Sequence, residues 1–196
     1  MRKKSHIRLA DIVFEEINNE ELNKYKFYFK VGSILSDVVP TFLWKKHRID
    51  ITNSEFKRSV YNFLNSKYHG RLYSVRAGII THYLSDYFTF PHNKECHWNL
   101  WIHNAYEGRQ LELMKNLRSI HELITFRIKS FYQISQVKSL DELFNEIERL
   151  HNEYIIRVQE VSNQLDIDLY YIECVSYFVM SFLVKNSLNY KSSYAF

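Results

Sequence analysis

The sequence predicts an all-α protein, a single-domain multi-helix bundle, and two observations support this fold class. The chain of 196 residues contains only four glycines and two prolines, too few for the many turns of a β-sandwich or barrel. Hydrophobic residues make up 46% of the chain, and they recur at helical spacing over long stretches. A chain of this length can build one substantial core, so we expect one domain over residues 1–196.

The first elements are expected to be two helices. Ser5 can cap a helix that runs to about Ile17, because a serine hydroxyl accepts a hydrogen bond from a free backbone N–H of the first turn. Asn19, followed by two glutamates, can open a second helix that continues toward Val31. Gly32 is expected to break this second helix.

The middle of the chain is expected to contain a long irregular segment. Residues 32–40 read as a loop, and an irregular stretch follows through Asn53. Apolar residues at helical spacing then predict a helix from Ser54 to about Lys67, and Gly70 ends this unit.

Two further helices are predicted on either side of a proline. The first runs from Arg71 to Phe90, since Pro91 cannot continue the hydrogen-bonding pattern. The second is expected to begin near Trp98 and to reach Phe131, with a potential kink at Gly108.

The last two helices are expected to be scaffold. Ser139 opens a capping box with Glu142, followed by apolar residues at steady helical spacing. The final helix begins near residues 166–168. Its apolar stretch, residues 169–184, contains Glu173 and is shorter than the roughly 20 residues of a bilayer span. We interpret it as a buried central helix, with a membrane-contacting helix as the alternative.

Charge distribution and cysteine content bear on nucleic-acid binding and on the compartment in which the protein works. The formal net charge of +4 is spread along the chain without a run of five like charges, so a dedicated nucleic-acid surface is not indicated. The basic start, Met1 to Lys4, is not followed by a continuous apolar region of the kind found in secretory signals. Cys96 and Cys174 are compatible with a reducing compartment, and a cytoplasmic location is predicted.

Two histidine–acid pairs are the most informative motif of the chain. His82 precedes Asp86 by four residues, His103 precedes Glu107 by four, and His92 lies between the pairs. Residues four apart share one face of a helix, so each pair can direct an imidazole and a carboxylate at the same point. About one such pair is expected by chance in a chain of this composition, so the motif needs support from further residues.

Further potential ligands extend the set to eight residues, too many for one tetrahedral zinc ion, so two or more metals are implied if any bind. The alternatives without metal stay open at this stage: a hydrogen-bonded surface pair, a helix cap for the aspartate in the early loop, and an ordinary loop histidine. The eight candidate ligands are His6, Asp37, His47, His82, Asp86, His92, His103 and Glu107.

These residues, in this order and spacing, resemble the zinc-dependent phospholipase C family, whose helical fold is shared with zinc-dependent single-strand nucleases. The resemblance covers roughly residues 1–130. The matching pieces are Gly32-Ser33-Ile34-Leu35-Ser36-Asp37, His47, Thr81-His82-Tyr83-Leu84-Ser85-Asp86, Pro91-His92-Asn93 and His103-Asn104-Ala105-Tyr106-Glu107.

The resemblance implies a cluster of two to three Zn²⁺ ions. The first ion would be held by Asp37, His47, His82 and Asp86. The second would be held by His92, His103 and Glu107. Asp86 would bridge to a third ion, which His6 would also bind. In secreted members an amino-terminal tryptophan completes this third site, whereas here the chain starts with Met1.

The activity implied by the resemblance is phosphodiester hydrolysis of a phospholipid by a metal-bound hydroxide, because clustered zinc lowers the pKa of bound water. Asp37 would be the catalytic base. The substrate would be a phospholipid or another phosphodiester, met through peripheral contact with a membrane. Choline-preferring members have two aromatic side chains where this chain has Val38 and Trp44, so Trp44 is the one candidate substrate contact.

Two other functions remain as alternatives. The nuclease branch of the fold would cleave single-stranded nucleic acid, and the lack of a basic run disfavours it. A helical protein with a non-catalytic metal site is the other alternative. The sequence does not predict the oligomeric state.

Overall fold

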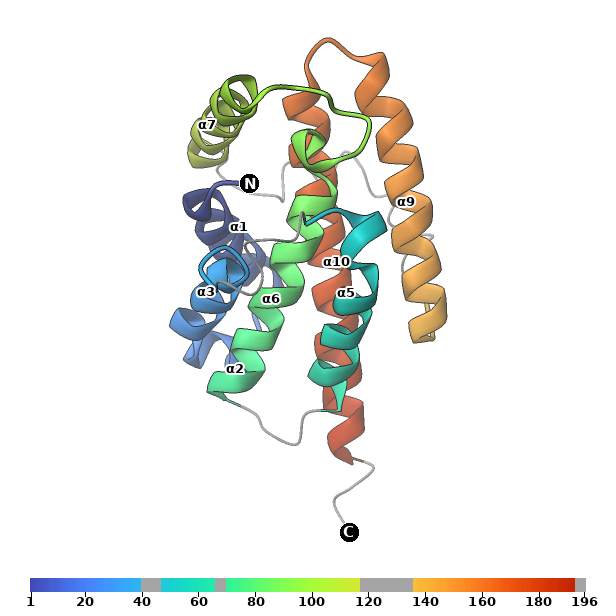
Figure 1. Ribbon diagram of the computed structural model, residues 1–196. Coiled ribbons are helices and arrows are strands. Elements are labelled where there is room, and N and C mark those ends of the chain that lie inside the picture. Colours follow the sequence, from blue (N-terminus) through green and yellow to red (C-terminus); the bar gives the residue numbers. More distant parts are fainter. Residues whose placement is uncertain (40–46, 66–69, 117–135, 193–196) are drawn as a thin grey trace.

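The computed structural model describes residues 1–39, 47–65, 70–116 and 136–192 (Figure 1). Within these ranges every regular element is a helix, which confirms the all-α prediction. The helices are α1 (Lys3–Ile17), α2 (Glu20–Lys24), α3 (Lys26–Leu35), α5 (Ile49–Leu64), α6 (Arg71–Tyr87), the 3₁₀ turn η1 (Phe90–His92), α7 (Leu100–Asn116), α9 (Leu140–Glu160) and α10 (Gln164–Ser192).

Helix α10 is the centre of the bundle, as predicted. It packs against α1, α5, α6, α7 and α9, and side chains such as Ile172 and Val179 are completely buried. By length and composition its segment Gln164–Ser187 could cross a membrane, but 72% of the apolar stretch is buried among the other helices. The burial therefore identifies α10 as the core helix of this bundle.

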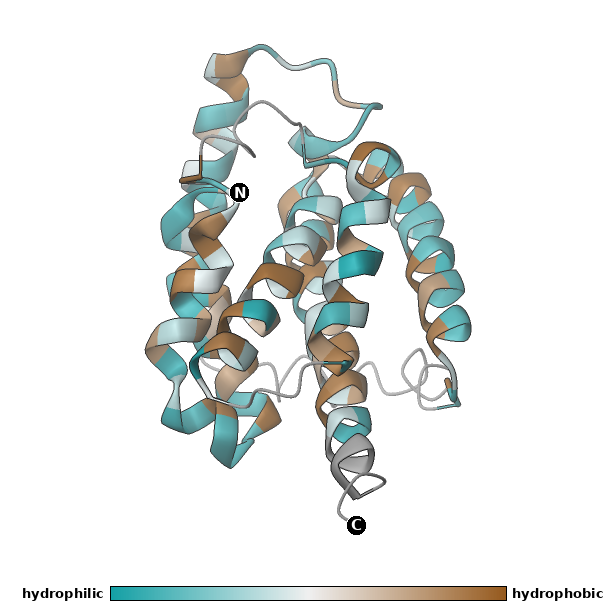
Figure 2. Ribbon diagram, turned by 60° about the horizontal axis from the view of Figure 1, so that its bottom comes forward, coloured by the Kyte–Doolittle hydropathy of each residue, from teal (hydrophilic) through white to brown (hydrophobic). Residues whose placement is uncertain are grey.

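Helix α9 covers the outside of the bundle with one apolar face. Its brown residues turn toward the other helices and its teal residues turn outward in Figure 2. The buried face includes Leu143, Ile147 and Val158, which follow one another at helical spacing. Ser139 caps the helix as predicted, because its hydroxyl accepts the backbone N–H of Glu142 at 3.2 Å.

The expectation that Gly32 breaks a helix is wrong. Helix α3 continues through Gly32 to Leu35 and packs against α6 with the two backbones in contact. A Cβ atom at Gly32 would collide with the carbonyl of Val75, and one at Gly78 would collide with the carbonyl of Phe29. Glycine is therefore present at this contact for close approach of two helices and not for helix termination.

Several predicted boundaries also need correction. The single helix expected up to Val31 is interrupted at Tyr25, which separates α2 from α3. Helix α5 begins at Ile49, earlier than the expected Ser54, and α6 ends at Tyr87 before a separate 3₁₀ turn. These differences arise because tertiary packing overrides local propensity at helix ends.

The remaining boundary predictions concern the first and the seventh helix. Ser5 lies inside α1 and is buried, so Arg2 and not Ser5 precedes the first helical residue. Helix α7 begins at Leu100 and runs through Gly108 as one helix to Asn116. Its expected continuation to Phe131 lies outside the described residues. The expected end at Lys67 of the helix predicted from Ser54 also lies outside them.

Candidate metal centre

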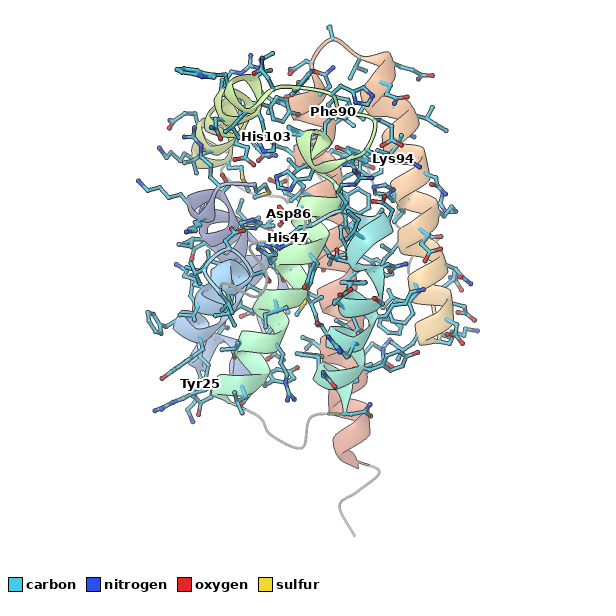
Figure 3. The ribbon with its side chains drawn as sticks, in the orientation of Figure 1. Tyr25, His47, Asp86, Phe90, Lys94 and His103 are labelled. Atoms are coloured by element: carbon cyan, nitrogen blue, oxygen red, sulfur yellow. The ribbon has the colours of Figure 1, made fainter. Side chains whose placement is uncertain are left out.

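The eight predicted ligand residues all come together near the C-terminal end of α6. His47, Asp86 and His103 are labelled in Figure 3, and they approach one another from different parts of the chain. The eight side chains form three groups whose ligand atoms lie within 4.8 Å of one another. The first donor group is Asp37 with His47 and His82, the second is His92 with His103 and Glu107, and the third is His6 with His82 and Asp86.

Six separate segments supply these side chains. Helix α6 supplies two of them from one face, as the four-residue spacing predicts, and α7 supplies another two in the same way. His6 comes from α1, and Asp37 comes from the turn after α3. His47 lies two residues before α5, and His92 lies in η1.

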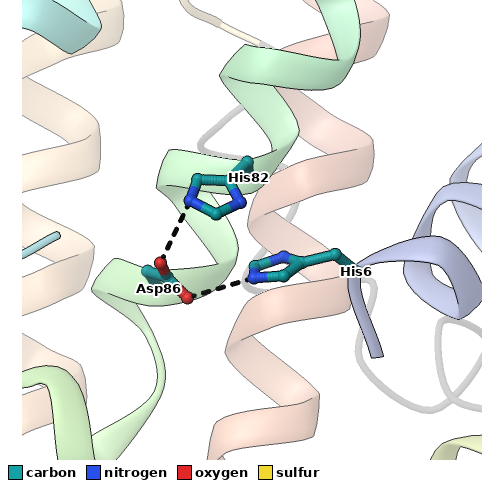
Figure 4. Close-up of side chains that lie close together, drawn as sticks. All are labelled: His6, His82 and Asp86. Atoms are coloured by element: carbon teal, nitrogen blue, oxygen red, sulfur yellow. Dashed lines mark ion pairs between the residues drawn. The ribbon is translucent and has the colours of Figure 1, made fainter. Parts of the chain in front are cut away.

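Asp86 is the central residue of the centre. Its side chain is buried, and its two oxygens face different partners. Oδ1 lies 3.5 Å from Nε2 of His6, whereas Oδ2 lies 3.3 Å from Nε2 of His82 (Figure 4). Oδ2 also lies 3.1 Å from Nδ1 of His47. This division of oxygens between two donor groups is the geometry that a bridging carboxylate requires.

The charges around Asp86 keep it ionised. Burial alone would raise the pKa of this carboxyl group, but the ammonium group of Met1 and the surrounding imidazoles outweigh burial and hold the pKa well below its usual range. The buried histidines respond in the opposite sense, because burial lowers the pKa of His82 to about 4. The centre therefore contains neutral imidazole at His6 and His82 beside the ionised carboxylate of Asp86, the forms that bind metal. His47 differs, because the Asp86 carboxylate outweighs burial there and raises its pKa.

Hydrogen bonds fix the tautomers of two histidines. Nδ1 of His82 lies 2.9 Å from the carbonyl oxygen of Ser33, so Nδ1 carries the proton. The Ser85 hydroxyl donates to the carbonyl of His82 at 2.7 Å, so it can only accept from Nδ1 of His6, 2.9 Å away. In both rings the Nε2 lone pair is left directed into the centre, which is how second-shell partners orient metal ligands.

This convergence of acceptors needs a cation. Three buried atoms of the candidate ligands have no hydrogen-bond partner among the described residues: Nε2 of His6, Oδ2 of Asp37 and Nε2 of His47. Tetrahedral zinc with bonds of about 2.0–2.1 Å places its ligand atoms roughly 3.3 Å apart. The separations of 3.3 and 3.5 Å around Asp86 agree with that value. The residues therefore fit zinc.

The second donor group lies closer to the surface. Nε2 of His92 and Nε2 of His103 each lie 3.0 Å from the same oxygen of Glu107. Burial would raise the pKa of Glu107, but the hydrogen bonds to both imidazoles lower it well below the ordinary range. The side chains of His92 and His103 are 18% and 26% exposed, so solvent reaches this group.

Asp37 lies at the edge of the first donor group. Its side chain is 22% exposed, with Oδ1 4.0 Å from Nε2 of His82 and Oδ2 3.6 Å from Nε2 of His6. Burial raises the pKa of Asp37 to about 6, and the nearby Asp86 carboxylate adds to the rise. This aspartate is thus both near the ligand atoms and accessible from outside.

The amino group of Met1 is a component that sequence reasoning did not place in the centre. Its nitrogen lies 2.8 Å from Oδ1 of Asp86, 2.8 Å from Nε2 of His92 and 3.1 Å from Oε1 of Glu107. Burial lowers the pKa of this amine, but the two carboxylates outweigh burial and raise it. The sequence signal for this amine was that Met1 lies only five residues before the candidate ligand His6.

Two buried residues outside the predicted ligand set hold the His92 segment in place. Asp168 on α10 accepts the backbone N–H of Phe90 at 3.0 Å and the hydroxyls of Tyr106 and Tyr154, each at 2.8 Å. Because Phe90 starts η1 and Tyr106 precedes Glu107, one carboxylate connects both parts of the second donor group with the scaffold.

Asn93 is the other such residue. Its side-chain amide donates to the carbonyls of Tyr87 and Thr89 at 3.1 and 3.0 Å, and its oxygen lies 2.9 Å from Nε2 of His151. His151 lies on α9 and is buried. Asn93 therefore connects the turn that carries His92 with the end of α6 and with α9.

The other histidines and the predicted substrate residue lie elsewhere. His97 is exposed and Cys96 is half-buried, and neither belongs to a donor group of the described residues. Trp44, the predicted substrate contact, lies outside the described residues, as do His69 and His121.

Comparison with known proteins assigns the family. Residues 5–160, about four fifths of the chain, match the family described as zinc dependent phospholipase C. Neither the curated proteins nor the solved structures compared with the chain contain a match. The matched region includes His6 and every other predicted ligand. With this match and the three donor groups around Asp86, the chain belongs to the zinc-dependent phospholipase C family.

Proposed function

We propose that this protein is a zinc-dependent phosphodiester hydrolase that removes the head group of a phospholipid. The observation that supports this proposal best is the set of three adjoining donor groups, two of which share His82. A structural zinc site in a protein usually has four ligands around one ion, whereas adjoining sites with accessible donors are typical of hydrolytic enzymes.

The donor groups suggest which residues would hold zinc. Asp37, His47 and His82, with Asp86, would bind one ion. The second group, His92, His103 and Glu107, would bind another, and the two oxygens of Asp86 would bridge from the first ion to a third beside His6. Zinc in such a site activates water as a nucleophile and neutralises negative charge on the phosphate.

The residues of the chain would contribute three further effects. Asp37 is 22% exposed at the edge of the centre, and its buried Oδ2 has no hydrogen-bond partner among the described residues, so Asp37 is placed to accept the proton of an attacking water. Ser33 and Ser85 hold His82 and His6 in the tautomers that present Nε2. The fixed geometry reduces the reorganisation that the reaction would otherwise require.

The test is zinc content together with hydrolysis. Purified protein loaded with zinc is expected to contain two to three equivalents by elemental analysis and to release the phosphorylated head group from short-chain phospholipids. A generic phosphodiester and a single-stranded oligonucleotide serve as comparison substrates, since cleavage of the oligonucleotide alone would support the nuclease alternative. Zinc-replete protein that cleaves no phosphodiester would contradict the proposal.

We further propose that the first turn of α7 contacts the lipid surface. Leu100, Trp101 and Ile102 are 72%, 87% and 45% exposed, and they directly precede the candidate ligand His103. Three consecutive exposed apolar residues are unusual on a free surface, and tryptophan favours the interface between lipid and water. A lipid held at this turn would have its phosphate near the second donor group.

Vesicle binding measures this contact. Trp101→Ser is expected to weaken sedimentation with phospholipid vesicles about threefold to tenfold, because burial of one large aromatic side chain is lost. Phe27→Ser is the matched control, since Phe27 is also highly exposed, at 71%, but lies on α3, away from α7. Equal losses in both variants would contradict a specific role for the α7 turn.

A further inference from the structure

An open cavity of about 640 Å³ connects the surface with the metal centre. Its lining includes Met1 and Asp37, which both lie in the centre, and Leu111 of α7. The other lining residues are polar and charged: Arg2, Lys3, Lys4, Glu112 and Lys115. A molecule that enters here passes between the start of α1 and the second half of α7.

The lining of this cavity carries an excess of positive charge. Lys115 forms an ion pair with Glu112 at 2.7 Å, so these two charges offset each other. Lys3 and Lys4 are exposed, and the part of the chain that the structure describes offers neither of them an ion-pair partner. Arg2 donates to a backbone carbonyl of α7 at 2.7 Å, an uncharged acceptor that leaves the guanidinium charge in place.

The position of these three cations strengthens their effect. Arg2 precedes α1, and Lys3 and Lys4 begin its first turn, which contains no acidic residue. The amino end of a helix itself carries partial positive charge, so the helix adds to the field of the side chains. Asp37, the other acid of the lining, would be engaged by zinc in the proposed function. Charge of one sign in a cleft attracts ligands of the opposite sign.

Among the residues that the structure describes, the lining of the cavity also offers no feature that recognises a cationic head group. A quaternary ammonium ion is bound by the faces of aromatic rings. None of the described lining residues is aromatic, and Val38, which follows Asp37, is aliphatic. Lysine and arginine side chains would repel the ammonium group of choline or ethanolamine.

Resting on the phosphodiester hydrolase function, we infer that the preferred substrate is a phosphodiester with net negative charge, whose head group is uncharged or anionic, and that Arg2, Lys3 and Lys4 select it. Phosphatidylglycerol belongs to this class. Phosphatidylcholine, whose head group carries a cation that cancels the phosphate charge, does not.

A comparison of two short-chain lipids tests the inference on the zinc-loaded protein. The ratio of kcat/KM for dihexanoyl phosphatidylglycerol to that for dihexanoyl phosphatidylcholine is expected to exceed one and to decrease as salt is added. Lys3→Glu with Lys4→Glu is expected to lower this ratio roughly threefold to tenfold, because two positive charges become negative near a solvated anion. Glutamate is favoured in the first turn of a helix, so this variant should fold.

The matched control is Lys24→Glu with Lys185→Glu. It makes the same change in net charge at exposed positions on α2 and α10, and its ratio is expected to equal that of the unchanged protein. Zinc content measured in every variant separates loss of metal from loss of selectivity. A ratio that falls equally in the control would overturn the inference, because the effect would then be one of overall charge.

Binding of the water-soluble products separates this inference from the proposed function. Calorimetry with glycerol phosphate and with phosphocholine needs no turnover, and glycerol phosphate is expected to bind more tightly in a manner that depends on Lys3 and Lys4. Failure to hydrolyse either lipid would contradict the proposed function alone. Equal or tighter binding of phosphocholine, or binding unaffected by the double substitution, would overturn the inference whether or not turnover is seen.

Discussion

At the scale of single residues, Asp86 determines how the centre is organised. It is buried and ionised, and each of its oxygens faces a different donor group. A carboxylate in this position costs free energy unless positive charge compensates it. The Met1 ammonium provides that charge at 2.8 Å, and the proposed zinc ions would provide more.

Substitution of Asp86 is therefore expected to release more zinc than substitution of His6. In the proposed centre Asp86→Ala would remove a ligand shared by two ions, whereas His6→Ala would remove one imidazole from one group. We expect loss of about two equivalents in the first variant and at most one in the second, measured by elemental analysis after dialysis. Equal or reversed losses would refute the bridging role of Asp86.

At the scale of elements, the contact between α3 and α6 positions the first donor group. Gly32 and Gly78 allow the two backbones to touch, and this contact brings the carbonyl of Ser33 to Nδ1 of His82. The turn after α3 then carries Asp37 to the same place. The packing of two helices thus sets both the tautomer of one ligand and the position of another.

Gly78→Ala is expected to destabilise the protein by about 1–3 kcal/mol, because the added methyl group would force α3 and α6 apart. The matched control is Gly108→Ala in α7, where the new Cβ atom would meet only the end of the flexible Arg2 side chain. Alanine has the higher helix propensity, so this control should be neutral or stabilising by up to about 1 kcal/mol. Urea denaturation measures both, and similar losses would contradict the account of the α3–α6 contact.

The network of Asp168 predicts a distinct pH dependence. Burial raises the pKa of Asp168 to about 7, whereas in the unfolded chain the pKa lies near 3.9. The native state therefore retains a proton that the unfolded state releases, and this contribution to the free energy of unfolding falls as pH rises from about 4 to 7.

Asp168→Asn should remove this pH dependence, because the amide stays neutral. The free energy of unfolding of the unchanged protein minus that of the variant is expected to decrease by on the order of 2 kcal/mol between pH 5 and 8. Urea denaturation of both proteins in the presence of a chelator provides the measurement. A difference that stays constant over this range would show that Asp168 is ionised throughout.

At the scale of the whole molecule, the centre connects segments that are far apart in sequence. Donors come from α1, α6 and α7 and from three connecting segments, while α10 supports them from the core through Asp168. Zinc held at such a place would bind the folded state and not the unfolded chain. Binding of this kind adds directly to the free energy of unfolding.

Removal of zinc is accordingly expected to lower the melting temperature by about 10 °C, given that saturating zinc contributes roughly 4 kcal/mol and that a chain of this size loses about 2–4 °C per kcal/mol. Circular dichroism melts with and without a chelator measure the shift, and added zinc should restore the original value. A melting temperature unaffected by chelation would contradict coupling of the centre to the fold.

Much of the fold and of the site could be predicted from the sequence, for physical reasons. The four-residue spacing of His82 and Asp86 predicts one shared helix face, and the scarcity of glycine and proline disfavours a fold of many strands. The role of Gly32 could not be predicted, because a glycine that permits close packing and one that ends a helix look alike in sequence. Asp168 and the Met1 amine were missed because the partners that connect them with the centre are distant in sequence: Tyr106 lies 62 residues from Asp168, and Asp86 lies 85 residues from Met1.

The distribution of ligands along the chain has a consequence for biosynthesis. His6 leaves the ribosome about 100 residues before Glu107, and Asp168, which fastens the second donor group to the core, emerges later still. A nascent chain therefore displays solitary imidazoles long before they can chelate anything. The candidate ligand set is complete only once Glu107 has been added, and its support from Asp168 follows 61 residues later, so the proposed centre would form late in synthesis.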